Sequence, residues 1–237
     1  MSRVKNDLYD YEGLSIYQYD DKFKFSLDSI LLAEYVELKP NISLIVDFCT
    51  GNAPVPLILS KKTKAKIYGF ELQKSIYNLA NLSVIENKLD KQIQIINANI
   101  KDAINYILPE SVDIVTCNPP YFKYNRNSVV NINDEKAIAR HEIAMTLEDI
   151  MVSAKYILKN KGALYIVHRT DRLEEIINCL SKYNFAVKKL QFVYSSYEKE
   201  AIMVLIKAVK NGQVGVKINP PLDVLEYKSY KGIFDKR

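Results

Sequence analysis

The fold of this chain is indicated by residues 44–60, LIVDFCTGNAPVPLILS. The first five residues form a short apolar run of the length expected for a buried strand. A tight turn follows, in which Gly51 can adopt a positive φ, and residues 52–60 then continue as a mostly apolar helix. A strand that enters a helix through one turn is the repeating unit of α/β proteins. The stretch therefore predicts a parallel sheet covered by helices.

The same alternation continues along the chain. The expected strands are 44–48, 66–70, 92–96, 112–117, 162–168, 186–194 and 201–208, and the expected helices are 29–38, 52–60, 73–87, 101–108, 146–159 and 171–183. The last two strands have no helix between them, so we expect them to pair antiparallel. The pattern predicts an α/β fold with a mostly parallel seven-stranded sheet, an antiparallel last strand and helices on both faces.

Composition supports one globular domain. The 237 residues are 48% hydrophobic and 26% charged, which excludes disordered and fibrous classes. We expect residues 1–40 to form an irregular N-terminal extension that ends in a helix, and residues 41–237 to form the core.

The longest apolar run, 201–206, is too short to span a membrane. The start lacks the apolar region of a signal peptide. Three separated cysteines form neither a disulfide framework nor a metal-ligand pair, so we expect a cytoplasmic protein without a metal.

The positive charge is concentrated in the last third of the chain. The net charge is +5, and residues 151–237 hold 16 Lys and Arg against 8 Asp and Glu, a net charge of +8. Such an excess fits either a polyanionic partner or a solvated lysine-rich surface.

Polar residues gather at the expected strand ends, where ligands bind in parallel sheets. The segment 47–53, DFCTGNA, partly matches a glycine-rich nucleotide loop, although an ordinary turn is the simpler reading. Glu71 ends the next strand and can accept hydrogen bonds from ribose hydroxyls, or it can be an exposed carboxylate near a helix start. Asn99 can bind an adenine amino group while Ile100 packs on the ring, unless the asparagine only forms a turn.

The most specific motif is Asn118-Pro119-Pro120-Tyr121, which directly follows an apolar strand. Two prolines restrict the backbone and remove its donors, which leaves the asparagine and proline carbonyls as acceptors. Asn118 Oδ1 and the Pro119 carbonyl can accept both hydrogens of an amino group on a planar substrate, and Tyr121 can stack on its ring. A second Asn-Pro-Pro, at 219–221, lacks the aromatic residue, and we expect a turn there.

At this motif the chain resembles class I S-adenosylmethionine-dependent N-methyltransferases, which share a Rossmann-like fold. A closer resemblance, from about Leu14 onward, is to the bacterial tRNA1(Val) adenine-37 N6-methyltransferases. It rests on seven segments in the expected order: FKFSLDSILL (23–32), DFCTGNAPVPL (47–57), NPPYF (118–122), ARHEIAMTLEDI (139–150), HR (168–169), KEA (199–201) and PPL (220–222).

The resemblance implies S-adenosyl-L-methionine as cofactor and the anticodon loop of a tRNA as partner. It implies that the flipped adenine is bound by Asn118, Pro119, Pro120 and Tyr121. The implied cofactor-binding residues are Lys24, Phe25, Ser26, Asp47, Cys49, Gly51, Asn52, Ala53, Glu71, Leu72, Asn99, Ile100 and Asn118. Cys49 and Ala53 stand where the class has glycine, so we expect the loop to approach the cofactor differently or less closely.

Basic side chains are expected to contact RNA phosphates. The candidates are Lys123, Arg126, Arg140, Arg169, Lys188, Lys189 and Lys199. The long polar segment 123–142 is expected to cover the substrate, with a surface insert as the alternative.

Three other functions stay open: glutamine N5-methylation of release factors, adenine N6-methylation of rRNA or DNA, and a catalytically silent RNA-binding module on the same fold. About 40 residues precede the first expected strand, too few for the N-terminal domain typical of the release-factor enzymes. We expect a monomer.

Overall fold

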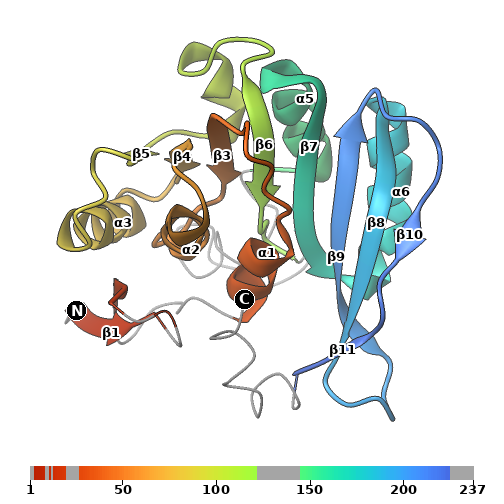
Figure 1. Ribbon diagram of the computed structural model, residues 1–237, viewed down its shortest axis with the longest axis horizontal. Coiled ribbons are helices and arrows are strands. Elements are labelled where there is room, and N and C mark those ends of the chain that lie inside the picture. Colours follow the sequence, from red (N-terminus) through yellow and green to blue (C-terminus); the bar gives the residue numbers. More distant parts are fainter. Residues whose placement is uncertain (1–2, 9–10, 12, 20–26, 122–144, 225–237) are drawn as a thin grey trace, which may run out of the picture.

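The computed structural model describes residues 3–8, 11, 13–19, 27–121 and 145–224 of the chain. Within these residues one sheet of nine strands forms the centre of the molecule (Figure 1), in the order β10-β8-β9-β7-β6-β3-β4-β5, with β11 also pairing with β8. The strands are β3 (Leu44–Phe48), β4 (Lys66–Phe70), β5 (Ile93–Ile96), β6 (Val112–Cys117), β7 (Leu158–Arg169), β8 (Phe185–Tyr194), β9 (Ala201–Lys210), β10 (Lys217–Ile218) and β11 (Leu222–Asp223). All seven expected strands are present.

The pairing confirms a mostly parallel sheet. Strands β5, β4, β3, β6 and β7 pair in parallel with their neighbours, whereas β9 lies antiparallel between β7 and β8. The two-residue strands β10 and β11 extend the sheet along β8. Residues 219–221 connect them in an extended path rather than the expected turn, because the Asn219 N–H donates to the Leu190 carbonyl of β8 at 2.8 Å.

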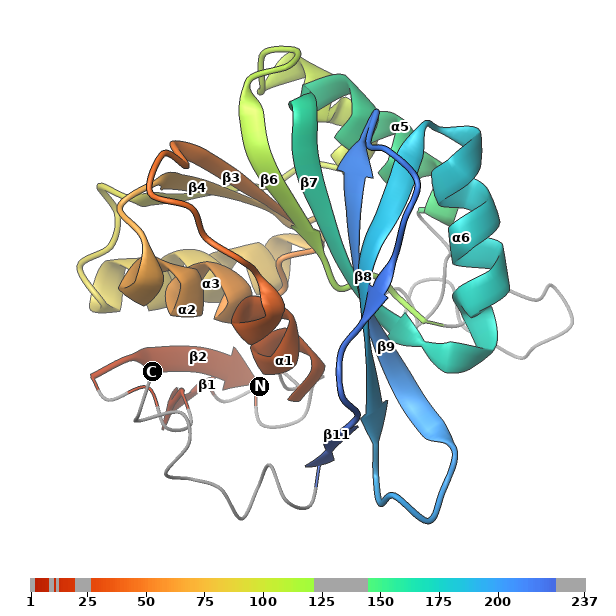
Figure 2. The ribbon, with the colours of Figure 1, turned by 45° about the vertical axis from the view of Figure 1, so that its right-hand side comes forward.

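Helices cover both faces, because successive strand residues point to opposite sides. Ile45 belongs to one core cluster and Val46 to the other. The first cluster packs under α1 (Leu27–Tyr35), α2 (Pro54–Lys62) and α3 (Lys74–Glu86), as Figures 1 and 2 show. The second packs under the 3₁₀ helix η1 (Ile100–Asn105), α5 (Leu147–Ile157) and α6 (Leu173–Lys182), which follows the short turn η2 (Thr170–Arg172).

Local signals set several helix ends. Thr146 accepts from the Asp149 N–H, while the Asp149 carboxylate accepts from the Thr146 N–H, a reciprocal capping box at the start of α5. Helix α2 begins at Pro54, two residues later than expected, because Ala53 is left-handed with φ 72°. Proline suits this first helical position, where its missing N–H would have no helical partner.

The irregular N-terminal extension was a wrong expectation. Residues Arg3–Asp7 (β1) and Ser15–Tyr19 (β2) form an antiparallel hairpin outside the main sheet. Its backbone is held by α3, since Asn87 Oδ1 accepts from the Ser15 N–H at 2.9 Å and Ser83 Oγ accepts from the Tyr17 N–H at 2.9 Å. These partners are distant in sequence, so local patterns do not reveal them.

Strand order reverses between β3 and β6. From β3 the chain moves outward to β4 and β5, and it then returns to place β6 on the other side of β3. At such a reversal the connections leave in opposite directions and open a crevice at the carboxyl ends of the strands. A ligand-binding site is therefore expected beside the residues that end β3 and β6.

Candidate active site

Asp47, near the end of β3, joins the two strands at this reversal. Its side chain is 1% exposed and accepts from Thr50 Oγ at 2.6 Å and from Thr116 Oγ of β6 at 2.5 Å. Burial raises the pKa of Asp47 to about 7, against the lowering effect of these two hydrogen bonds. The carboxyl group thus fixes the turn after β3 against β6, and it is enclosed by protein.

The turn after β3 adopts glycine-like backbone geometry at three positions. The φ angles are 56° at Cys49, 58° at Gly51 and 72° at Ala53. Non-glycine residues adopt this left-handed region at a cost of about 1–2 kcal/mol each. The loop therefore has left-handed backbone at three positions, two of them without glycine, and its closer or more distant approach to the cofactor stays a prediction. Cys49 Sγ lies 3.6 Å from Met145 Sδ and Ala53 is fully buried, so both side chains pack against protein.

Glu71 follows β4 and faces this turn. One carboxylate oxygen accepts from the Gly51 N–H at 3.0 Å, and the other accepts from the Gln73 N–H at 2.8 Å. The residue is 7% exposed, and burial raises its pKa to about 7. A carboxylate can accept about four hydrogen bonds, more than the backbone supplies here, so Glu71 can still accept from a ligand. The next residue, Leu72, is 43% exposed and offers an apolar surface beside it.

The third strand end holds two asparagines with different partners. Asn99 Oδ1 accepts from the Lys101 N–H at 3.1 Å and caps η1, and Ile100 is 4% exposed in the core. Asn97, which lies at the expected strand end but for which no cofactor contact was expected, donates to the carbonyls of Glu71 and Leu72 at 2.8 and 3.0 Å. Asn97 therefore supports the backbone that presents Glu71. Its position at a strand end was the available signal.

The fourth strand end brings the Asn-Pro-Pro-Tyr motif against α1. Tyr121 Oη lies 2.7 Å from Asn118 Oδ1 and 2.6 Å from Asp28 Oδ2, and Asn118 Nδ2 donates to Ser29 Oγ at 3.0 Å. Burial, followed by the nearby Asp28 charge, raises the pKa of Tyr121 well above its usual value. Asp28 and Ser29 belong to the segment 23–32 that carried the family resemblance, but no role for either was expected.

The ring and backbone of Tyr121 have further contacts. The His168 ring centroid lies 5.1 Å from that of Tyr121, and Arg172 donates to the Tyr121 carbonyl at 3.3 Å. His168 Nδ1 accepts from the Arg169 N–H, and burial followed by the Arg172 charge lowers the pKa of His168 to about 4. A neutral imidazole therefore lines the side of the tyrosine.

Residues 24–194 match the methyltransferase small domain family. The chain belongs to this family. This methyltransferase is S-adenosylmethionine-dependent.

Two relatives are named tRNA1(Val) (adenine(37)-N6)-methyltransferase. The protein of Bacteroides thetaiotaomicron is 23% identical over 193 residues, which cover 80% of this chain and 78% of the relative. That of Porphyromonas gingivalis is 23% identical over 208 residues, which cover 85% of this chain and 80% of the relative. A solved structure of a predicted O-methyltransferase from Agrobacterium tumefaciens matches with a TM-score of 0.66 at 18% identity, covering 83% of this chain and 87% of that one. That likeness shows a shared Rossmann-like methyltransferase fold.

The described residues fit the cofactor of the family. S-adenosylmethionine carries a ribose with two hydroxyl donors and a planar adenine. The Glu71 carboxylate would accept from the ribose, as acidic residues at this strand end do in dinucleotide-binding sheets, and Leu72 would meet the adenine face. The Asn52 side chain is 7% exposed and donates to the Tyr17 carbonyl at 3.0 Å, so it ties the loop to β2.

The other predicted residues fall into three groups. Lys24, Phe25, Ser26, Lys123, Arg126 and Arg140 lie outside the described residues. Arg169 ends β7 and Lys199 precedes β9, so both lie at the end of the sheet that carries Asn118. Lys188 and Lys189 lie in the first half of β8, where Lys188 donates to the Gln213 carbonyl and Lys189 pairs with Glu37 at 2.7 Å. The structure does not bring these two lysines to the candidate site.

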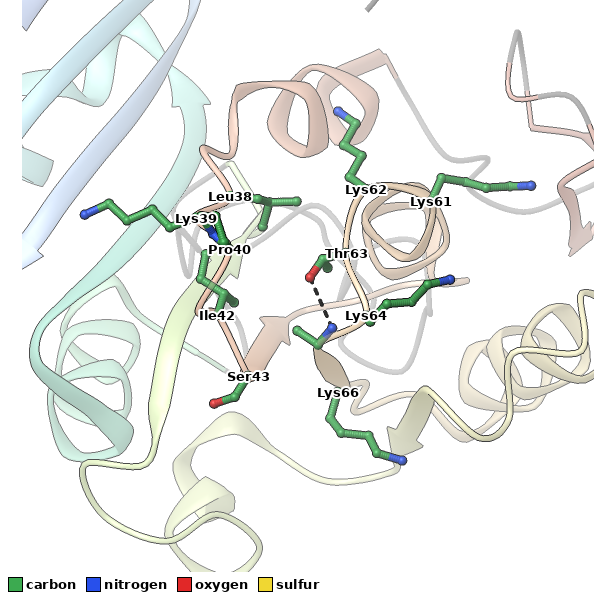
Figure 3. Close-up of a pocket in the computed structure, with 11 residues that line it drawn as sticks. Leu38, Lys39, Pro40, Ile42, Ser43, Lys61, Lys62, Thr63, Lys64 and Lys66 are labelled. Carbon is green, nitrogen blue, oxygen red and sulfur yellow. Dashed lines mark hydrogen bonds between the residues drawn. The ribbon is translucent and has the colours of Figure 1, made fainter.

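A hollow at the amino ends of β3 and β4, opposite the candidate site, is lined by several lysines (Figure 3). Lys39, Lys61 and Lys66 point their amino groups away from one another in this view. The cations therefore do not converge on one anion, and the hollow is separate from the strand ends described above. In the described residues, none of the helices has the length and hydrophobicity to cross a bilayer.

Proposed function

We propose that this methyltransferase methylates N6 of an adenine in tRNA, with adenine 37 of tRNA1(Val) as the specific target. The observation that carries the proposal is the position of Asn118, Pro119 and Tyr121 at the end of β6, next to the loop that Glu71 supports. The names of the relatives give the RNA and the base.

The proposed chemistry depends on holding an amino group in place. When bound, S-adenosylmethionine supplies an electrophilic methyl group. An adenine amino nitrogen is a weak nucleophile, because its lone pair is delocalised into the ring. Asn118 Oδ1 and the Pro119 carbonyl would accept both amino hydrogens and favour the form in which the lone pair is localised. Positioning of this kind can supply several kcal/mol of the barrier reduction, and the proton is lost after transfer without a strong base.

Tyr121 would contact the face of the unstacked base. Its backbone is held by Arg172 and its ring lies beside His168, so the aromatic surface is positioned before the substrate binds. Unstacking a base costs a few kcal/mol, and less where the base is already single-stranded. A base in an anticodon loop meets that condition.

The test is methylation of tRNA by the purified full-length protein, read by mass spectrometry of nucleosides. We expect N6-methyladenosine in a tRNA1(Val) transcript and none in the same transcript with guanine at position 37. Asn118→Ala should lower turnover about 100-fold, because the acceptor that stabilises the reacting amino group is lost. Asn219→Ala, in the second Asn-Pro-Pro segment, is the matched control and should keep normal turnover.

Two results would contradict the proposal. One is methylation of a release-factor glutamine, rRNA or DNA with no methylation of tRNA. The other is near-normal tRNA methylation by Asn118→Ala.

A further inference from the structure

We propose that Asp28 is a positioning residue that accepts the hydrogen bond of the Tyr121 hydroxyl and so frees Asn118 Oδ1 to accept from the substrate amino group. The inference rests on the proposed function, because it assigns Asn118 the role of amino acceptor. It adds a residue of α1 to the site and explains why α1 contacts the motif after β6.

The geometry presents one donor with two acceptors. Tyr121 Oη lies 2.6 Å from Asp28 Oδ2 and 2.7 Å from Asn118 Oδ1. A phenol hydroxyl has one proton, so it cannot donate fully to both oxygens. The high pKa of Tyr121 keeps that proton on the hydroxyl at neutral pH. While Tyr121 donates to Asn118, the oxygen needed by the substrate is engaged.

Asp28 resolves this competition. A carboxylate is a stronger acceptor than an amide oxygen, because the hydrogen bond is charge-assisted. When an amino group reaches Asn118, the tyrosine proton can turn wholly to Asp28 without leaving a buried donor unpaired. Tyr121 thus exchanges one hydrogen bond for another while its ring stays in place.

The surrounding contacts hold this arrangement. Asp28 lies in the first turn of α1, and Ser29, 7% exposed, accepts from Asn118 Nδ2 at 3.0 Å. Ser29 therefore keeps the amide nitrogen turned toward α1 and the amide oxygen turned toward Tyr121. The helix itself packs on α2 and on β7, so the two residues are presented by a packed element rather than by a free loop.

The test is a double-mutant cycle of Asp28→Ala and Tyr121→Phe, measured as kcat on the substrate that the wild-type enzyme methylates. In Asp28→Ala the hydroxyl has Asn118 as its remaining acceptor, so we expect kcat to fall about tenfold, the equivalent of one lost hydrogen bond. Tyr121→Phe should lower kcat less. The double variant should be several-fold faster than Asp28→Ala, because removal of the hydroxyl frees Asn118 again. Asp28→Asn keeps an acceptor oxygen and should keep more activity than Asp28→Ala.

Readouts beside kcat separate this role from a structural one. Binding of S-adenosylmethionine by calorimetry and the melting temperature should change little in the double variant relative to Asp28→Ala. A matched control is the pair Glu148 and Tyr183, in which a helix-start carboxylate also accepts from a tyrosine hydroxyl. Glu148→Ala and Tyr183→Phe should leave kcat near the wild-type value.

The outcomes also separate this inference from the proposed function. If Asp28→Ala turns over normally, or if the double variant is as slow as Asp28→Ala or slower, the positioning role of Asp28 is wrong. If the wild-type enzyme methylates no tRNA, the proposed function fails instead, and the same cycle on its true amino substrate still decides the role of Asp28.

Discussion

Asp47 and Glu71 are buried carboxyl groups at neighbouring strand ends, but their partners differ. Asp47 accepts from the hydroxyls of Thr50 and Thr116 and is 1% exposed, so it is enclosed by protein. Glu71 is bound by two backbone N–H groups at the edge of the turn. Burial raises the pKa of both to about 7. We propose that Asp47 holds the loop in place and that Glu71 contacts the cofactor.

The raised pKa of Glu71 predicts pH-dependent cofactor binding. The ribose hydroxyls need a deprotonated acceptor, and deprotonation occurs as pH rises through about 7. The affinity for S-adenosylmethionine should therefore rise about tenfold per pH unit below pH 7 and level off above it. The free protein should show the opposite trend in stability. Its folded-state pKa exceeds the unfolded value of 4.5, so the stabilisation is full below pH 4.5 and is lost as pH rises to 7.

Calorimetric titration between pH 6 and pH 8 measures this effect. Glu71→Gln should bind the cofactor weakly with a nearly flat pH profile, whereas Asp90→Asn, at an exposed position, should keep the wild-type profile. If the affinity of Glu71→Gln for the cofactor changed with pH as steeply as that of the wild type, the pH dependence would be attributed to Asp47.

At the scale of elements, the β1–β2 hairpin is attached to the cofactor loop as well as to α3. Asn52 of the loop donates to the Tyr17 carbonyl of β2, and Asn87 at the end of α3 bonds both the N–H and the carbonyl of Ser15. A two-stranded hairpin alone is marginally stable in water. These side chains therefore hold the hairpin, together with the buried Leu8 and Ile16.

Removal of the Asn87 side chain should loosen the hairpin. Asn87→Ala leaves the Ser15 N–H and carbonyl without that partner, so we expect the free energy of unfolding to fall by about 1–3 kcal/mol. Hydrogen exchange of the amides in β1 and β2 should become faster, and those of β3 and β6 should change little. Asn78→Ala, an exposed position on the same helix, is the control. Unchanged exchange in β2 would show that other contacts hold the hairpin.

At the scale of the whole molecule, the basic residues that the structure describes between 151 and 224 lie at both ends of the sheet. Arg169 and Lys199 lie at the end with Asn118, and their side chains are exposed. Lys189 and Lys207 both bind Glu37, which follows α1 in the chain. A count of charges in the sequence cannot make this division, because it depends on strand direction.

The division predicts which lysines and arginines contribute to RNA affinity. We measure the affinity for tRNA by anisotropy at several salt concentrations and plot its logarithm against the logarithm of the salt concentration. Arg169→Ala and Lys199→Ala should each reduce the magnitude of this slope by about 1, the value for one lost phosphate contact. Lys188→Ala and Lys189→Ala should leave the slope unchanged. Equal effects of all four substitutions would argue for a diffuse electrostatic surface.

Much of the fold followed from local patterns. The apolar runs at 44–48, 66–70 and 112–117 became β3, β4 and β6 with the same boundaries, and the helix expected from residue 146 is α5, which Thr146 caps. These features depend on side-chain periodicity and capping within a few residues, which a sequence contains directly. The hairpin and the edge strands β10 and β11 were missed, because their hydrogen bonds go to distant partners.

The sequence by itself determined the order of the seven central strands and the kinds of side chain at the four strand ends, since both follow from residue type and spacing. Only the tertiary structure decided that Asp47 joins β3 to β6, that Cys49 and Ala53 keep left-handed backbone, and that Asp28 shares the hydroxyl of Tyr121 with Asn118. The reason is physical, because such contacts join segments that are remote in sequence. They form only when folding brings the carboxyl ends of the strands next to each other and next to α1.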